Sequence, residues 1–97
     1  MGKSRTVLSP EEFTQKLALL PDWRVVDQKK LTRNYSFPDF QKALDFVNRV
    51  GIIAEEQGHH PDLRLGWGFV EVETWTHDAG GLTEQDFLLA SKIDRLS

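Results

Sequence analysis

The sequence predicts a small α+β domain in which a four-stranded, mainly antiparallel sheet carries three helices on one face. Two observations predict this class. Capped segments of helical periodicity lie near the start, middle and end, and two pairs of strand-like segments lie between them. The predicted order is helix, two strands, helix, two strands, helix. A length of 97 residues suits one domain, over residues 1–97, and leaves no room for a second.

A helix and a strand pair are predicted in the first third of the chain. The segment 9–12, Ser-Pro-Glu-Glu, is typical of a helix start because its serine and second glutamate can cap each other. We expect this helix to end at Pro21-Asp22, since the residue before a proline disfavours helical backbone. Strands are predicted over 23–26 and 31–37, and the short polar segment between them predicts a hairpin.

The longest helix is predicted to begin at Pro38-Asp39 and to end at Gly58, because glycine readily adopts left-handed backbone. Its apolar stripe is wider than one small sheet requires, so we expect part of it to face another subunit. Gly51 and Ala54 would let that subunit approach closely. A chain this short is often marginal alone, which also favours an oligomer.

A second pair of strands and a last helix are predicted in the part of the chain that follows Gly58. A short strand is predicted over 63–65 and a long one over 69–77. Thr83 and Asp86 are spaced as an N-cap and its third helical residue, so they predict the start of the last helix. We expect the buried side of this helix to be formed by Leu88, Leu89, Ile93 and Leu96.

Composition and charge argue against several kinds of protein. The formal net charge of -3 argues against general nucleic-acid binding, which requires a basic surface. The lack of cysteine excludes disulfides and thiolate metal sites. No apolar run approaches the roughly 18 residues of a membrane span, and residues 1–6 lack the apolar core of a secretory signal. We therefore expect a cytoplasmic protein.

The three histidines of the chain lie where predicted elements end. His59 and His60 follow the Gly58 stop, and His77 closes the long strand. Scaffolds often place working groups at such ends, although a surface or satisfied histidine with no chemical role is the commoner case. Their spacing is not that of a usual zinc site, so we expect no metal.

Two acidic residues and one aromatic residue are further candidates. Glu55 precedes His59 by four residues, so it could orient that imidazole or simply solvate the helix end. Asp86 could hold an imidazole in one tautomer or serve only as a helix cap. Trp67 lies between two glycines, where it could stack on a flat ring or pack in the core.

As a set, these residues resemble the signature of the pterin-4a-carbinolamine dehydratase family. The segment 76–86 is similar to the most typical stretch of that family, and the resemblance runs from Leu8 to Leu96. The residues that carry it are Glu55, His59, His60, Pro61, Trp67, His77 and Asp86.

The resemblance implies an enzyme that dehydrates 4a-hydroxytetrahydrobiopterin to quinonoid dihydropterin and water. This reaction recycles the pterin cofactor of aromatic amino-acid hydroxylases. The pterin is the substrate, and no metal or organic cofactor is implied. The resemblance also implies a homodimer whose sheets join, or a homotetramer.

The resemblance assigns expected roles to the site residues. His59 and His77 would be the acid–base pair, because imidazoles can give and take protons at neutral pH. His60 would bind the substrate and stabilise charge. Glu55 would orient His59, and Asp86 would hold His77 or face the pterin. The substrate-binding residues would include Pro61, which fixes the turn, and Trp67.

The same family includes interaction proteins, which leaves an alternative function open. One member is a dimerisation partner of a homeodomain transcription factor, and pterin-dehydratase-like members assist Rubisco assembly. Such roles would use the apolar face of the long helix or the open sheet. The segment Leu63-Arg64-Leu65 departs from the aromatic residue and asparagine of many members, so part of the usual pocket wall is expected to be missing.

Overall fold

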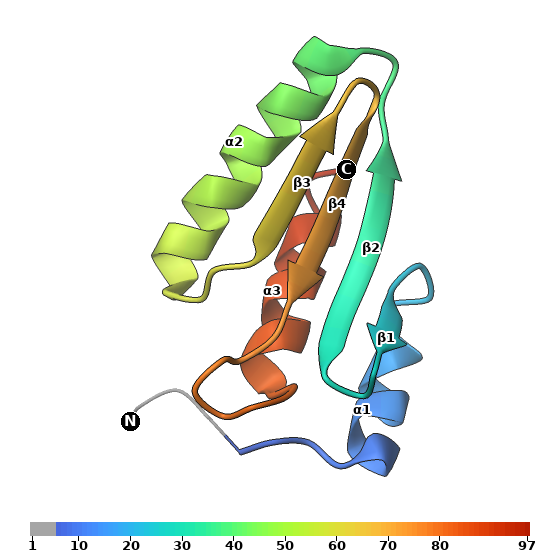
Figure 1. Cartoon of the computed structure of the whole chain (residues 1–97), viewed down its shortest axis with the longest axis vertical. Coiled ribbons are helices and arrows are strands. Elements are labelled where there is room, and N and C mark those ends of the chain that lie inside the picture. Colours follow the sequence, from blue (N-terminus) through green and yellow to red (C-terminus); the bar gives the residue numbers. More distant parts are fainter. Residues whose placement is uncertain (1–5) are drawn as a thin grey trace.

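The computed structural model describes residues 6–97 and confirms the predicted order of elements. The strands form one antiparallel sheet in the order β1-β2-β4-β3. The three helices cover one face of this sheet and leave the other open (Figure 1). The elements are α1 (Pro10–Leu17), β1 (Arg24–Val26), β2 (Lys30–Ser36), α2 (Phe40–Gln57), β3 (Asp62–Gly66), β4 (Phe69–Thr74) and α3 (Glu84–Asp94).

Helix α1 begins as predicted but is shorter than predicted. Ser9 and Glu12 cap each other, and the hydrogen bonds from Ser9 hold the pKa of the Glu12 carboxyl below its usual range. The helix ends at Leu17, well before Pro21. The chain continues from there in tight turns, in which backbone N–H groups donate to the carbonyl three residues earlier. These turns bury Leu20 in the core.

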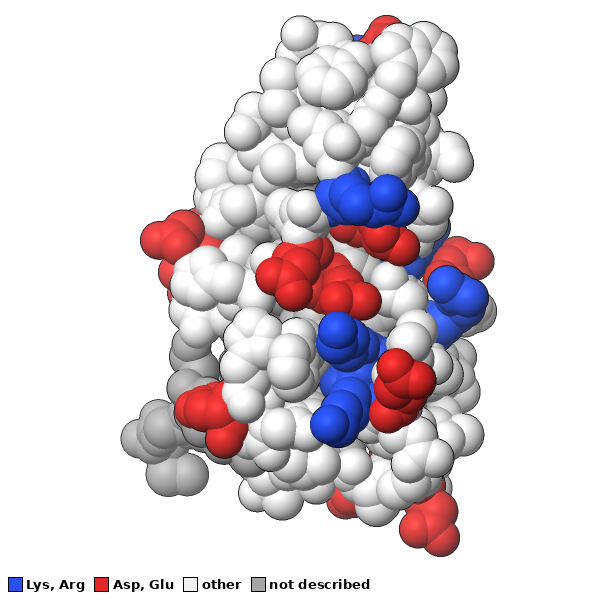
Figure 2. Space-filling view, viewed as in Figure 1, with Lys and Arg blue, Asp and Glu red and all other residues white. Residues whose placement is uncertain are grey.

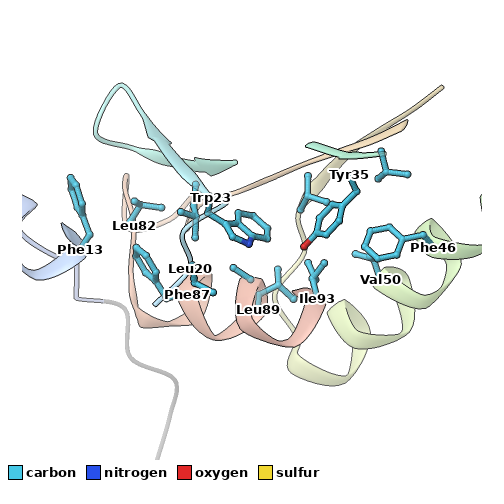
Figure 3. Packing of buried hydrophobic residues seen from close by; sticks show 14 of the residues in the cluster. Phe13, Leu20, Trp23, Tyr35, Phe46, Val50, Leu82, Phe87, Leu89 and Ile93 are labelled. Atoms are coloured by element: carbon cyan, nitrogen blue, oxygen red, sulfur yellow. The ribbon is translucent and has the colours of Figure 1, made fainter. Parts of the chain in front are cut away.

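The core fills the space between the sheet and the helices (Figure 3). In β4 and just beyond it, alternate residues are fully buried, as the predicted alternation requires. The expected buried side of α3 is wrong in one respect, because Leu88 is exposed. Asp86 lies on the buried side of this helix, so Leu89, Ala90 and Ile93 follow it inward and Leu88 faces out.

A part-buried polar cluster on Asp94 connects β2 with α3 at the edge of this core. One carboxylate oxygen, Oδ1, accepts hydrogen bonds from Trp23 Nε1 at 3.0 Å, from Arg33 Nη1 at 2.8 Å and from the Tyr35 hydroxyl. Figure 3 shows the indole nitrogen and the phenol oxygen both directed toward α3. Burial, and then the hydrogen bond to Asp94, raise the pKa of Tyr35 far above its ordinary value of 10.0.

The buried phenol predicts how stability depends on alkaline pH. Tyr35 is the one tyrosine of the chain, so any tyrosinate band that develops near 295 nm comes from this residue. Because its pKa is higher in the folded protein than in the unfolded chain, its contribution to stability is complete below about pH 10 and is lost as the pH rises further. We expect tyrosinate to appear together with loss of circular dichroism. Ionisation near pH 10 in a fully folded protein would contradict this.

The open face of the sheet carries mixed charge rather than one sign (Figure 2). Lys30 is 3.4 Å from Glu73, and Arg64 Nε donates to Glu71 at 2.9 Å. Arg64, part of the segment that departs from the family pattern, is therefore ion-paired on this face. None of the helices within residues 6–97 is long and apolar enough to cross a bilayer. The region searched for a secretory signal lies, apart from Thr6, outside the described residues.

The expectation that Gly51 and Ala54 both face a second subunit is half wrong. Ala54 is buried within the chain itself, among the residues that α2 turns toward the sheet. The space beside Gly51 is open, because a Cβ there would meet no atom within 4 Å other than those of the adjacent residues and of the nearby backbone of α2. Phe40 and Ile52 of the same helix are exposed. An apolar part of α2 thus remains uncovered in the single chain.

Candidate active site

The end of α2 and the end of β4 meet around a cavity of about 380 Å³. The chain reaches this cavity from two places that lie far apart in the sequence. All three histidines line it, as the sequence analysis required. The lining residues are Gly58, His59, His60, Pro61, Asp62, Trp75, Thr76, His77 and Asp78.

Gly58 sets the direction in which the first two histidines leave α2. It has a φ of 68°, in the left-handed region that favours glycine, and its N–H donates to the carbonyl of Ala54 at 2.9 Å. The helix therefore stops, and the chain turns toward β3 as predicted. After this turn His59 no longer follows the helical spacing that would place it above Glu55.

His59 pairs with Asp86, a residue 27 positions away in the sequence. Its Nε2 lies 2.6 Å from the carboxylate Oδ1, and the histidine as a whole is 8% exposed. An ionised carboxylate can only accept, so Nε2 carries the proton and Nδ1 is the nitrogen left for a ligand. The expectation that Glu55 orients His59 is therefore wrong. Asp86 is expected to hold His77 or to face the pterin, and it is placed for neither, because it is fully buried against His59 and does not line the cavity.

The Asp86 carboxylate is fully buried and has four hydrogen-bond donors around it. Besides the imidazole, it accepts from the hydroxyl of Thr74 at 2.6 Å, the hydroxyl of Thr76 at 2.8 Å and the backbone N–H of Thr83 at 3.0 Å. The last bond is the reciprocal half of the predicted helix cap. Asp86 thus caps α3 and holds His59 in one orientation, so the two roles left open by the sequence coexist.

His60 pairs with Glu55 at the exposed side of the cavity. Its Nε2 lies 2.5 Å from the Glu55 carboxylate, and the two side chains are 61% and 78% exposed. Water screens such a pair, so it contributes little to stability. The two adjacent histidines therefore face different carboxylates in different surroundings, one buried and one wet.

His77 lies beyond the end of β4, not within it as predicted. The strand ends at Thr74, and Thr76 forms an isolated bridge to Gly81 that holds the following loop. The His77 imidazole is exposed and meets the Trp75 indole edge to face, with ring centroids 4.3 Å apart. Among residues 6–97 its ring has no side-chain hydrogen-bond partner in the structure.

The structure does not bring Trp67 to this cavity. Trp67 lies in the turn between β3 and β4, at the opposite end of that hairpin from the histidines, and is 72% exposed. Pro61 does line the cavity. Trp75 also lines the cavity and was not among the predicted site residues, although the alternation of the strand places it on the same side as His77.

The geometry offers little to a metal ion. Within the described part of the chain, no group of three or more histidine, aspartate or glutamate side chains is arranged to hold one. His59 and His60 each have a nitrogen committed to a carboxylate. The arrangement can transfer protons, since three imidazoles line one cavity and one of them is hydrogen-bonded to a buried acid.

A scan against protein families matches residues 6–96 to the family described as pterin 4 alpha carbinolamine dehydratase. The chain belongs to this family. A relative from Rubrobacter xylanophilus, provisionally named pterin-4-alpha-carbinolamine dehydratase, is 53% identical over 89 residues, which span 92% of this chain and 83% of that protein. The resemblance stated from the residues is thereby confirmed.

Two solved structures extend the comparison of this pterin dehydratase family member. A transcriptional coactivator/pterin dehydratase from Brucella melitensis superposes with a TM-score of 0.89 at 32% identity, over 94% of this chain and 98% of that one. A pterin dehydratase-like protein identified as a RuBisCO assembly factor in the alpha-carboxysome gives 0.66 at 21% identity, over 77% and 88%. The second likeness shows the fold alone.

Proposed function

We propose that this protein dehydrates 4a-hydroxytetrahydrobiopterin to quinonoid dihydropterin and water, as a hydro-lyase that recycles the pterin of aromatic amino-acid hydroxylases. The observation that carries the proposal is the shared cavity of His59, His60 and His77, with Asp86 buried behind it. Membership of the family supports the substrate class. The reaction as proposed needs no metal and no organic cofactor.

The chemistry requires two proton transfers at one bicyclic ring. The C4a–O bond breaks as a proton is delivered to the departing hydroxyl, which leaves as water. The proton on N5 is removed, and its electron pair forms the C4a–N5 double bond. Both transfers suit imidazole near neutral pH, and each typically contributes roughly 10²- to 10⁴-fold to the rate.

We assign the base role to His59 and the acid role to His77. The Asp86 carboxylate accepts hydrogen bonds from four donors, and its contact with Nε2 would stabilise the imidazolium that forms when His59 accepts a proton through Nδ1. His77 is exposed at the cavity, where it can be reprotonated from water after each turnover. His60, with Glu55, would bind the substrate at the mouth and stabilise charge.

Replacing the proposed acid tests the function directly. We expect His77→Ala to lower the rate of dehydration of chemically generated 4a-hydroxytetrahydrobiopterin at least tenfold, because one of two proton transfers loses its catalyst. Circular dichroism should be unchanged, since the side chain is exposed. Lys29→Ala, in the exposed turn between β1 and β2, is the control and should keep the full rate. A wild-type rate in the His77 variant would remove this residue from the mechanism.

The alternative is an interaction protein that keeps the site without using it. One structural neighbour is named a transcriptional coactivator/pterin dehydratase and the other a RuBisCO assembly factor, so this fold is associated with such roles in other proteins. The meeting of three imidazoles at one cavity favours the enzyme, because a binding surface on α2 or on the open sheet has no need of them. Wild-type protein that folds but leaves the carbinolamine at its uncatalysed rate would favour the alternative.

The proposal includes the oligomeric state of the protein and its location. We propose a homodimer or homotetramer, which the exposed apolar residues Phe40 and Ile52 and the open space beside Gly51 support. We also retain a cytoplasmic location and a pterin as the small-molecule partner.

A further inference from the structure

Trp75 is the one large apolar side chain among the residues that line the cavity, and the proton transfers proposed above do not use it. It follows β4 directly, between Thr74 and Thr76. Both threonine hydroxyls donate to Asp86 on the helix side of the sheet, so the residues at 75 and 77 project to the other side. Trp75 and His77 therefore stand next to each other on one wall of the cavity.

Contacts with His77 and Lys30 hold the Trp75 indole in place. The His77 imidazole meets it at an interplanar angle of 87°, with ring centroids 4.3 Å apart. The ammonium of Lys30, from the start of β2, lies 5.3 Å from the indole centroid and 3.4 Å from Glu73. A cation at this distance from an indole is attracted to the ring, so the indole has a defined place before any ligand arrives.

The other side chains of the cavity provide no comparable surface. Besides Trp75, the lining consists of glycine, three imidazoles, one proline, one threonine and two acids. These groups can exchange hydrogen bonds and protons with the edge of a heterocycle. The faces of a flat bicyclic ring are best covered by an aromatic side chain, which gains contact area and stacking at small entropic cost.

We infer that Trp75 is the aromatic wall of the site and contacts the ring system of the bound pterin. This inference rests on the proposed function. It places the stacking residue at Trp75 and not at Trp67, which lies at the opposite end of the β3–β4 hairpin. It also gives Trp75 a role in binding affinity that is separate from the proton transfers of His59 and His77.

Calorimetric titration with 7,8-dihydrobiopterin, a stable pterin, tests the inference. We expect Trp75→Ala to raise the dissociation constant roughly tenfold to a hundredfold, the effect typical of losing one aromatic stacking partner. Trp75→Phe keeps an aromatic face and should bind much more tightly than the alanine variant. Trp67→Ala is the matched control and should bind like wild type. In steady-state assays Trp75→Phe should raise KM more than it lowers kcat.

A second measurement uses wild-type protein and does not depend on the folding of the alanine variant. The chain has three tryptophans, and their indole N–H resonances can be assigned with the Trp67→Phe and Trp75→Phe variants. We expect 7,8-dihydrobiopterin to shift the Trp75 resonance strongly and to leave that of Trp67 in place. A shift of Trp67 without one of Trp75, or a wild-type dissociation constant in Trp75→Ala, would overturn the inference.

The two proposals fail in different ways. If wild-type protein binds the pterin at Trp75 but does not accelerate dehydration, the proposed activity is wrong and the binding wall stands. If it accelerates dehydration while Trp75→Ala binds normally, the activity stands and the wall is wrong. If wild-type protein neither binds the pterin nor accelerates the reaction, both are wrong.

Discussion

Asp86→Ala is expected to lower the free energy of unfolding by about 3–5 kcal/mol, the range for breaking one side of a buried, hydrogen-bonded pair. Four donors, the His59 imidazole among them, lose their acceptor at once. The threonine hydroxyls can turn elsewhere, but the backbone N–H of Thr83 cannot. Since the total free energy of unfolding of a domain is roughly 5–15 kcal/mol, this substitution would remove a large share of it. Urea unfolding followed by circular dichroism measures the change in this free energy.

The control for Asp86 is the other acid in the first turn of α3. Glu84 is exposed and lies 3.4 Å from Lys16, so Glu84→Ala should change the free energy of unfolding by no more than about 1 kcal/mol. Asp86→Asn is the milder partner variant, because the amide keeps the shape and one acceptor. Equal stability of Asp86→Ala and wild type would show that the buried carboxylate is not holding the site together.

His59→Gln is expected to lower the rate of dehydration by roughly 10²- to 10⁴-fold, the usual effect of removing a general base. Glutamine can still donate a hydrogen bond to Asp86, so the carboxylate keeps its donor while the proton acceptor at Nδ1 disappears. The fold should therefore survive, and the loss should appear in kcat. Single-turnover measurement with chemically generated carbinolamine reports the chemical step itself.

The exposed histidine provides the comparison. His60→Gln should raise KM and affect kcat less, because the His60–Glu55 pair lies at the wet mouth of the cavity. A double variant of His59→Gln with Asp86→Asn should be far from additive, since the two residues act as one unit. If His59→Gln kept the wild-type rate, or if His60→Gln lost more kcat than His59→Gln, the assignment of the base would be wrong.

Local features of the sequence were enough to predict the elements. The Ser9 and Thr83 caps, the Gly58 stop and the alternation along β4 depend on neighbours within a few residues, and each lies where it was expected. The predictions that were wrong concern features that depend on contacts between residues far apart in the sequence. Helix α1 stops early so that Leu20 can enter the core, and Leu88 faces out because Asp86 turns the helix.

The sequence was also enough to find most of the candidate site residues. It was not enough to tell which acid pairs with which histidine. Spacing along a helix suggested Glu55 for His59, yet the left-handed turn at Gly58 rotates His59 away from that helix. The glycines on either side of Trp67 predict that its side chain is accessible, but accessibility does not tell which end of a hairpin faces a cavity. Trp75 was not predicted as a site residue, because it fits the alternating pattern of an ordinary strand.

The chain alone thus determines its α+β class, its helix ends and the residue types available for proton transfer, because these follow from local backbone preferences and from side-chain chemistry. Tertiary structure decides which acid serves which imidazole. Asp86 and His59 meet across 27 residues only when α3 docks against the sheet and α2 has ended at Gly58. Packing of whole elements sets that contact, and no short-range pattern encodes it.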